Sequence, residues 1–440
     1  MSGGDTKVAV VSLGCPKNLV DSEVMLARLA EAGCIVGAPM DDADVILINT
    51  CAFLEAARAE SLEVIAEALE HKRAGRAGRV VVAGCFPSRD GENLFSLAEG
   101  VDAIVGVNDR ERIVAAVTGR GRYSAVASAP QRGATDSGRF RLTPRHTAWL
   151  RIAEGCSQHC TFCTIPAIRG PFRSKPPDVV LHEARELVSD GAVELNVIAQ
   201  ETTGYGRDLD ESTDLARLLR RLDEESGASW IRLLYTYPRR FTDELIDAMA
   251  DCPHVVKYVD IPLQHVSDSV LKRMGRRVGK RDIETLLGKL RRRVDGIAIR
   301  TTFIVGFPGE TEADFRELLD FVREQRFEAM GVFEFSPEPG TPAADMPDTP
   351  PAEVAGERSG ELMLAQQEIA FDANRGRVGQ TLEVLVDGMD ESGCCVGRHA
   401  QQAPEIDSRC ILTKPQPAGA FVRCVVEDFD GYDIICRPPE

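Results

Sequence analysis

The stretch that decides the fold is GCSQHCTFC, Gly155–Cys163, which contains three cysteines, Cys156, Cys160 and Cys163. This C-x3-C-x2-C spacing lets one loop wrap three thiolates around one face of an iron–sulfur cube. Thirteen cysteines placed at random in 440 residues would give about 0.01 such triplets. Structural zinc needs a fourth ligand, and the nearby His159 lies awkwardly inside the loop. We therefore expect a [4Fe–4S] cluster whose fourth iron is open to a reactant, with zinc as the alternative.

The sequence around this loop alternates strand and helix patterns. Six apolar runs follow from Ala148 onward, each followed by a helical pattern, the last of which is a long helix over 351–375. Six such units predict an open, partial (β/α)6 barrel, and a full barrel of eight units is the alternative. The cysteine loop follows the first of these strands, at the end where such barrels place their chemistry. The six runs are AWLRIAEG, ELNVIAQET, WIRLLYTYP, YVDIPLQH, AIRTTFIVGFPG and AMGVFEFSPEPG.

A second set of cysteines lies in the first 120 residues. Three near-continuous apolar runs, KVAVVSLGC, DVILINTC and RVVVAGC, end at Cys15, Cys51 and Cys85. Such runs are typical of parallel strands buried on both faces, and the helical stretches between them predict a doubly wound α/β domain. The first helix has an N-cap candidate in Asp21 or Ser22. The carboxyl ends of parallel strands meet at one crevice, so the three thiols predict a second cluster. Any one of them alone would more often be a buried core residue.

The remaining segments complete a four-part organisation. Residues 121–147 are rich in Gly, Ser, Arg and Thr without an apolar period and predict a linker. The last part contains short strand patterns broken by Gly, Pro and Asp, which predict a small OB-like β-barrel. The expected boundaries are 1–120, 121–147, 148–375 and 376–440. Seven other cysteines match no ligand motif and are expected to be small apolar core residues: Cys34, Cys252, Cys394, Cys395, Cys410, Cys424 and Cys436.

Composition restricts the class of protein. The hydrophobic fraction of 43% is enough for ordinary cores, and no apolar run approaches the length that spans a bilayer. The N-terminus shows no signal peptide, so we expect a soluble, cytoplasmic protein whose clustered cysteines serve metal or redox chemistry rather than disulfides. The net charge of −17 disfavours a general nucleic-acid binder.

Several of these motifs resemble known families. GCSQHCTFC, including Phe162 before its last cysteine, is similar to the signature of the radical S-adenosylmethionine superfamily. VSLGCPKN, NTCAF and AGCF resemble the N-terminal domain of methylthiotransferases. CTIPAIRGPFRS, DIPLQH and FIVGFPGET also look like motifs of that family, and the last part of the chain resembles a TRAM domain. The resemblance covers nearly the whole chain.

The resemblance implies two [4Fe–4S] clusters and S-adenosylmethionine as cofactors. Cys156, Cys160 and Cys163 would hold the cluster that cleaves S-adenosylmethionine to a 5′-deoxyadenosyl radical. An auxiliary cluster on Cys15, Cys51 and Cys85 would carry the sulfur that a first S-adenosylmethionine methylates and that is then transferred. Phe162, Gln200 and Gly306 are the expected S-adenosylmethionine contacts, and a flavodoxin or ferredoxin is the expected electron donor.

Two branches of the methylthiotransferase family differ in substrate. One modifies an adenosine of tRNA, and the other modifies the β-carbon of an aspartate in ribosomal protein S12. The segment 376–440 has six Lys or Arg against eleven Asp or Glu, a balance that suits a basic protein better than tRNA. SLGCPKNLVDSE and GRHAQQAPEID also resemble the ribosomal-protein branch. We expect an enzyme acting on S12 without direct RNA binding. The alternatives are a tRNA adenosine 2-methylthiotransferase, a non-catalytic iron–sulfur sensor and a zinc-stabilised binding module.

Overall fold

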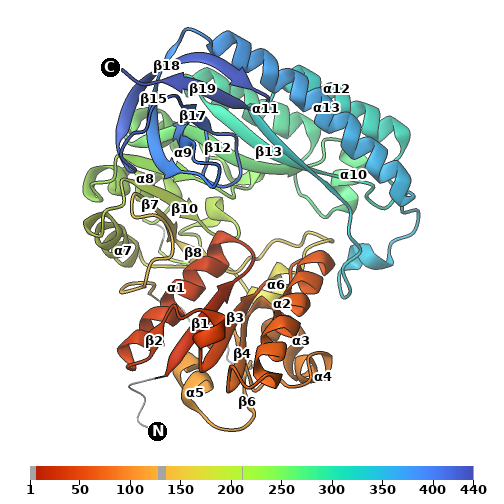
Figure 1. The fold of residues 1–440 in the computed structure, drawn as a ribbon. Helices are drawn as coiled ribbons and strands as arrows, with labels where there is room; N and C mark the ends of the chain where they lie inside the picture. The colour runs from red at the N-terminus through yellow and green to blue at the C-terminus, as the bar shows by residue number, and fades with distance from the viewer. Residues whose placement is uncertain (1–5, 127–134, 211, 440) are drawn as a thin grey trace. The chain divides into compact units, whose positions relative to one another are not determined.

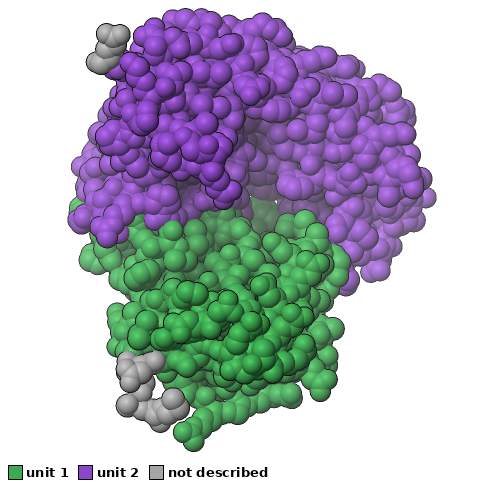
Figure 2. All heavy atoms as spheres, viewed as in Figure 1, with its two compact units in different colours: residues 1–142, 151–158, 163–186 green, residues 143–150, 159–162, 187–440 purple. Residues whose placement is uncertain are grey.

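The computed structural model describes residues 6–126, 135–210 and 212–439. The chain forms two compact units, shown in different colours in Figure 2. Unit 1 comprises residues 1–142, 151–158 and 163–186, and unit 2 comprises residues 143–150, 159–162 and 187–440. The segment that carries GCSQHCTFC therefore contributes residues to both units. Among the described helices, none is both long enough and apolar enough to cross a lipid bilayer.

Unit 1 is built on a parallel sheet in the order β2-β1-β3-β4-β5-β6 (Figure 1). Alternate residues of β3 and β4 point to opposite faces, because side chains in a strand alternate. Ile46 and Val80 pack into the core under α2 (Glu55–Arg73) and α3 (Cys85–Asp90). Leu47 and Val81 pack into the core under α1 (Pro16–Glu31) and α5 (Ile113–Thr118). The predicted doubly wound arrangement is confirmed. Its strands are β1 Lys7–Ser12, β2 Ile35–Val36, β3 Val45–Thr50, β4 Arg79–Gly84, β5 Ala103–Gly106 and β6 Tyr123–Ala125.

One helix of the N-terminal half, the first, begins at a different residue from the one expected. The helices of this half are α1 Pro16–Glu31, α2 Glu55–Arg73, α3 Cys85–Asp90, α4 Leu94–Leu97, α5 Ile113–Thr118, α6 Ile165–Arg169 and α7 Pro177–Ser189. The predicted N-cap at Asp21 or Ser22 is wrong, because α1 begins at Pro16 and its N-cap is Cys15, six residues before Asp21. Pro16 explains the earlier start, since proline is well suited to the first helical position.

The predicted linker contains ordered structure in its described part. Residues 123–125 form β6, which pairs in parallel with β5 at the sheet edge. Asp136 is 3% exposed and forms ion pairs with Arg151 and Lys175 at 2.7 Å each. Residues 127–134 of the predicted linker lie outside the described residues.

Unit 2 contains the second sheet, in the order β14-β13-β12-β11-β10-β7. Parallel pairing runs from β10 through β14, and a helix follows each strand, as a partial (β/α)6 barrel requires (Figure 1). This fold class is confirmed. The strands are β7 Thr147–Arg151, β10 Glu194–Ile198, β11 Trp230–Leu233, β12 Val255–Gln264, β13 Ala298–Val305 and β14 Ala329–Glu334. The later helices are α8 Leu215–Glu225, α9 Asp243–Asp251, α10 Asp268–Arg273, α11 Lys280–Arg293, α12 Glu312–Gln325 and α13 Ala352–Arg377. In unit 1, a separate two-stranded sheet pairs β8 Ala153–Glu154 with β9 Arg173–Ser174.

The C-terminal segment forms the expected small barrel. Five strands close in the order β15-β16-β17-β19-β18, with antiparallel pairs except between β17 and β19. Four of the seven unassigned cysteines lie in its core, and Cys34 and Cys252 are buried elsewhere, whereas Cys394 is exposed. The strands are β15 Thr381–Met389, β16 Cys395–His399, β17 Cys410–Leu412, β18 Phe421–Asp430 and β19 Asp433–Arg437.

A buried ion-pair network joins this closed barrel to the open sheet within unit 2. Glu194, the first residue of β10, is fully buried. Its carboxylate lies 3.0 Å from Arg232 of β11 and 2.8 Å from Arg398 of β16. Arg398 also pairs with Asp387 of β15 at 2.8 Å. Charges removed from water in this way are stable only when each is paired, so the network holds the closed barrel against the strands.

Candidate functional site

Three cysteines stand where neighbouring strands of unit 1 end. Cys15 follows β1, Cys51 directly follows β3, and Cys85 directly follows β4. The strands β1, β3 and β4 are adjacent and parallel (Figure 1). All three cysteines therefore lie at the carboxyl ends of these strands, on the same side of the sheet. The structure thus brings together the set that the strand pattern predicted.

Two glycines allow the cysteine-bearing turns to approach one another. Gly14 has φ +90°, and a Cβ there would lie 2.7 Å from Cys51 Cβ and 3.1 Å from its Sγ. Gly84 has φ +95°, and a Cβ there would lie 2.2 Å from Asn49 Oδ1. Only glycine combines this left-handed backbone with so close a contact. Each glycine directly precedes a cysteine, so the turn geometry and the thiol position are set together.

Gly14→Ala tests the cluster that is expected on Cys15, Cys51 and Cys85, and it should lower the amount of iron bound there. Alanine at Gly14 strains the backbone by about 1–2 kcal/mol and also pushes Cys51 out of place. Gly37→Ala is the matched control, since Gly37 has φ +82° with no atom within 4 Å of the added Cβ. Both variants share the backbone strain of alanine at a positive φ, and Gly14→Ala adds the contact with Cys51. Iron retained after anaerobic reconstitution should fall only in Gly14→Ala, and equal iron in the two variants would contradict this role.

The thiols of this set influence one another electrostatically. Burial opposes ionisation of Cys15, but Lys17, Arg169 and two backbone N–H groups outweigh it and lower the pKa of that thiol. Burial raises the pKa of Cys85 to about 12; Arg169 opposes the shift, and Cys15 and Cys51 add to it. Burial likewise raises the pKa of Cys51, with Cys15 contributing. Three thiolates this close repel each other, so a cationic metal centre would be needed to ionise all three.

The donor set fits an iron–sulfur cluster. A [4Fe–4S] cube offers a separate iron to each thiolate, so its ligands are spread around a larger centre than a single metal ion. Three thiols at the carboxyl ends of neighbouring strands, with Lys17 and Arg169 nearby, supply the ligands and the positive charge for such a centre.

The other cysteine set lies in the loop between β8 and α6. Gly155 has φ +76°, and a Cβ there would lie 2.3 Å from the Pro171 carbonyl oxygen. The Cys156 N–H donates to the Gly170 carbonyl at 3.1 Å, and the Gln158 N–H donates to Cys156 Sγ at 3.4 Å. Glycine thus again precedes the first cysteine of a set, and the loop closes back on the residues after α6.

Residues 159–162 of this loop form hydrogen bonds and ring contacts with residues at the end of α10 and after β13. Thr161 N–H donates to the Met274 carbonyl at 3.0 Å, and its hydroxyl donates to the Arg273 carbonyl at 2.8 Å. The ring of Phe162 meets Phe307 edge-on, with centroids 6.3 Å apart. Phe162 therefore packs against an apolar cluster that also contains Met274, and this contact anchors the end of the loop.

Gln200 and Gly306 both lie just beyond strand ends in unit 2. Gln200 is half-buried two residues after β10, and Gly306 directly follows β13. Gly306 has φ +72°, and a Cβ there would lie 2.6 Å from Ala355 Cβ, so close packing against α13 already requires glycine. His265 of the DIPLQH motif is fully buried and accepts the Ser267 N–H at 3.0 Å, as a structural hydrogen-bonding residue does.

Two further residues, Asn18 and Arg169, contact the turns or thiols of the Cys15, Cys51 and Cys85 set, and the sequence analysis assigned no role to them. Asn18 donates to the Leu13 carbonyl at 2.8 Å and to the Thr50 carbonyl at 3.0 Å, which ties the turns after β1 and β3 together. Arg169 donates to Cys85 Sγ at 3.3 Å. Both residues lie inside motifs that pointed to the family, VSLGCPKN and CTIPAIRGPFRS, and that position was the available signal.

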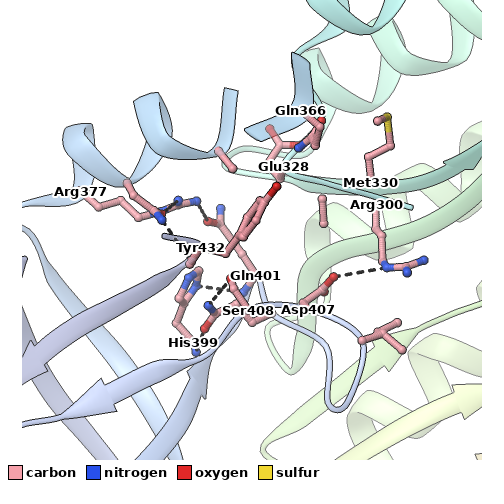
Figure 3. A pocket seen from close by; sticks show the side chains of 15 residues that line it. Arg300, Glu328, Met330, Gln366, Arg377, His399, Gln401, Asp407, Ser408 and Tyr432 are labelled. Carbon is pink, nitrogen blue, oxygen red and sulfur yellow. Dashed lines mark hydrogen bonds and ion pairs between the residues drawn. The ribbon is translucent and has the colours of Figure 1, made fainter. Parts of the chain in front are cut away.

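Unit 2 also contains a cavity of about 330 Å³ between the sheet and the closed barrel (Figure 3). Arg300 of β13 lines it and pairs with Asp407 at 3.3 Å. Burial, together with Arg377 and Arg232, lowers the pKa of His399 to about 3, so this side chain is neutral. The cavity lies near the amino ends of β13 and β14, whereas barrels of this kind place chemistry at the carboxyl ends. It is therefore part of the packing between sheet and barrel.

Family models match most of the chain. Residues 150–322 match the radical SAM superfamily, residues 7–106 match the uncharacterized protein family UPF0004, and residues 378–438 match the TRAM domain. Solved structures with a similar fold include the radical S-adenosylmethionine methyltransferase TsrM of Kitasatospora setae. Its TM-score is 0.55 at 17% identity, covering 75% of this chain and 72% of that one.

Curated relatives match along nearly their whole length. The ribosomal protein uS12 methylthiotransferase RimO of Geobacter sulfurreducens is 44% identical over 99% of this chain and 99% of its own. RimO of Desulforamulus reducens is 42% identical over 97% of this chain and 98% of its own. These matches confirm the resemblance seen in the motifs. The chain belongs to the RimO family of ribosomal protein uS12 methylthiotransferases, within the radical SAM superfamily.

Proposed function

We propose that this chain attaches a methylthio group to the β-carbon of an aspartate in ribosomal protein uS12. The observation that carries this function is the 42–44% identity, over nearly the full length, to enzymes named ribosomal protein uS12 methylthiotransferase. The β-carbon of an aspartate as the modified atom follows from the resemblance of the motifs. One S-adenosylmethionine gives up its methyl group and leaves S-adenosylhomocysteine. A second would accept one electron and break its C–S bond, giving methionine and a 5′-deoxyadenosyl group that takes the β-hydrogen of the aspartate and leaves as 5′-deoxyadenosine.

The two cysteine sets would hold the two [4Fe–4S] clusters. We assign Cys156, Cys160 and Cys163 to the radical-generating cluster and Cys15, Cys51 and Cys85 to the auxiliary one. When bound, the clusters supply the reducing electron for S-adenosylmethionine cleavage and the site that holds the transferable sulfur. Each set provides three protein ligands, so one coordination position per cluster stays available to a reactant.

The protein itself positions these groups. Turns that begin with Gly14, Gly84 and Gly155 place the thiols. The Phe162 ring packs against Phe307 and anchors the loop that contains Cys156, Cys160 and Cys163. We propose that Phe162, Gln200 and Gly306 contribute to S-adenosylmethionine binding. The corresponding domains are 1–120, 148–375 and 376–440, with 121–147 between the first two.

The acidic C-terminal barrel supports a basic protein substrate. Its segment 376–440 has six Lys or Arg against eleven Asp or Glu, so it attracts a basic ribosomal protein and repels phosphate backbones. We propose that the barrel helps to recruit uS12 without binding RNA directly. A flavodoxin or ferredoxin is the proposed electron donor.

Product analysis on two parallel substrates tests the function. The reconstituted enzyme receives S-adenosylmethionine and a strong reductant, together with either uS12 or tRNA that carries the modifiable adenosine. Mass spectrometry should find a methylthio group on uS12 and not on the tRNA. A gain on tRNA alone would overturn the substrate while leaving both cysteine sets in place.

A further inference from the structure

Arg169 is a fully buried cation placed between a thiol and two carboxylates of unit 1. Its side chain is 2% exposed. One terminal nitrogen, Nη2, donates to Cys85 Sγ at 3.3 Å and to Asn18 Oδ1 at 3.0 Å. The other, Nη1, donates to Asp21 at 3.0 Å and to Glu154 at 3.2 Å. The planar guanidinium therefore presents one nitrogen to the thiol while the carboxylates hold the other.

The charge of the surrounding network is balanced without the thiols. Four carboxylates and four cations of unit 1 interlock here, and nearly all of them are buried. The members are Asp21, Asp136, Glu154 and Glu183, with Arg110, Arg151, Arg169 and Lys175. Of these residues, Arg169 donates a hydrogen bond to a cysteine sulfur, Cys85 Sγ. A guanidinium held on several sides cannot turn away from Cys85 without breaking buried ion pairs.

Arg169 also belongs in sequence to the other cysteine loop. It lies six residues after Cys163, at the end of α6, and its partner Glu154 comes just before Gly155 and Cys156. α6 packs into the core of unit 1 through Ile168. Arg169 thus follows the loop of Cys156, Cys160 and Cys163 in sequence, but its side chain contacts the other cysteine set, at Cys85.

We propose that Arg169 is a positioning residue for the auxiliary cluster, which rests on the proposed assignment of Cys15, Cys51 and Cys85. Its N–H donates to the Cys85 thiolate, and its fixed charge favours the more negative, reduced state of the cluster. Hydrogen bonds to cluster sulfurs and local charge are the levers that set the reduction potential of such clusters. Arg169 therefore raises that potential and slows the release of iron.

The test uses the full-length protein with Cys156, Cys160 and Cys163 all replaced by Ala, so that only the auxiliary cluster remains. In this background, Arg169→Met and Arg169→Lys are compared with Arg110→Met. Arg110 is the matched control, because it pairs with the same Asp21 at 3.0 Å and with Asp136 at 2.8 Å, and its partners include no thiol. The measurements are bound iron, the rate of iron release to a chelator, and the midpoint potential from a redox titration followed by electron paramagnetic resonance.

Arg169→Met should shift the midpoint to a more negative potential and release iron on the order of tenfold faster. Arg169→Lys, which keeps the charge but not the fork, should fall between Met and wild type. Arg110→Met should keep the wild-type potential. If Arg169→Met keeps no iron while Arg110→Met does, the role in holding the cluster is supported. An unchanged Arg169→Met potential, or an equal shift or iron loss in Arg110→Met, would overturn the proposal. A background protein that binds no iron would instead refute the assignment of the auxiliary cluster.

Discussion

Cys160→Ala should abolish the formation of 5′-deoxyadenosine from S-adenosylmethionine, whereas Cys51→Ala should retain part of it. Cys160 lies in the loop that begins at Gly155, and Cys51 lies at the carboxyl end of β3 beside Gly14. Removal of one of three thiolates leaves a cluster without enough protein ligands, so each substitution should disable its own set. Both variants should lose methylthiolation of uS12, and for Cys51→Ala this loss should occur while radical chemistry continues.

The measurement is chromatography of 5′-deoxyadenosine beside mass spectrometry of uS12 in the same reaction. Cys394→Ala is the matched control, because this thiol is exposed in the closed barrel and belongs to neither set. It should keep both activities. Equal loss of 5′-deoxyadenosine in Cys51→Ala and Cys160→Ala would show that the two sets do not divide the work as proposed.

Glu194→Gln should destabilise unit 2 by about 3–5 kcal/mol, because it leaves the buried guanidinium of Arg232 without its carboxylate and leaves Arg398 with Asp387 alone. Glu194 is fully buried between Arg232 and Arg398. Both tryptophans of the chain, Trp149 and Trp230, lie in unit 2, so fluorescence during urea unfolding reports on this unit. The unfolding midpoint should move to lower urea. Glu224→Gln, an exposed position on α8, is the control and should leave the midpoint unchanged.

The same carboxylate predicts an acid dependence. Burial opposes its ionisation, but Arg398 and Arg232 outweigh burial and lower the pKa of Glu194 from 4.5 to about 2. A depressed carboxyl pKa gives stability that is present above the unfolded value and is lost as the pH falls toward the folded value. Wild type should therefore lose roughly 3 kcal/mol between about pH 4.5 and pH 2 from this group. Glu194→Gln should lack this part of the acid transition, and an identical acid profile in both proteins would contradict the assignment.

The sequence by itself determined the layers and the cysteine sets. Apolar runs that end in a cysteine predicted the parallel strands β1, β3 and β4, and the tight spacing of Cys156 to Cys163 required one loop. These features are local, because strand period and turn composition depend on neighbours within a few residues. The N-cap of α1 was misplaced for a local reason too, since Pro16 begins the helix before the expected polar residues.

Only the tertiary structure decided which charges meet. Arg169 lies 84 residues from Cys85, and Arg398 lies 204 residues from Glu194. Neither contact can be predicted from the pattern of neighbouring residues in the sequence. Burial decides the meaning of these residues, because a charged side chain in water is a solvated surface group, whereas the same group in the core must be paired. The cysteines could be predicted from spacing and strand ends, but the cations that surround them became visible only once the chain was folded.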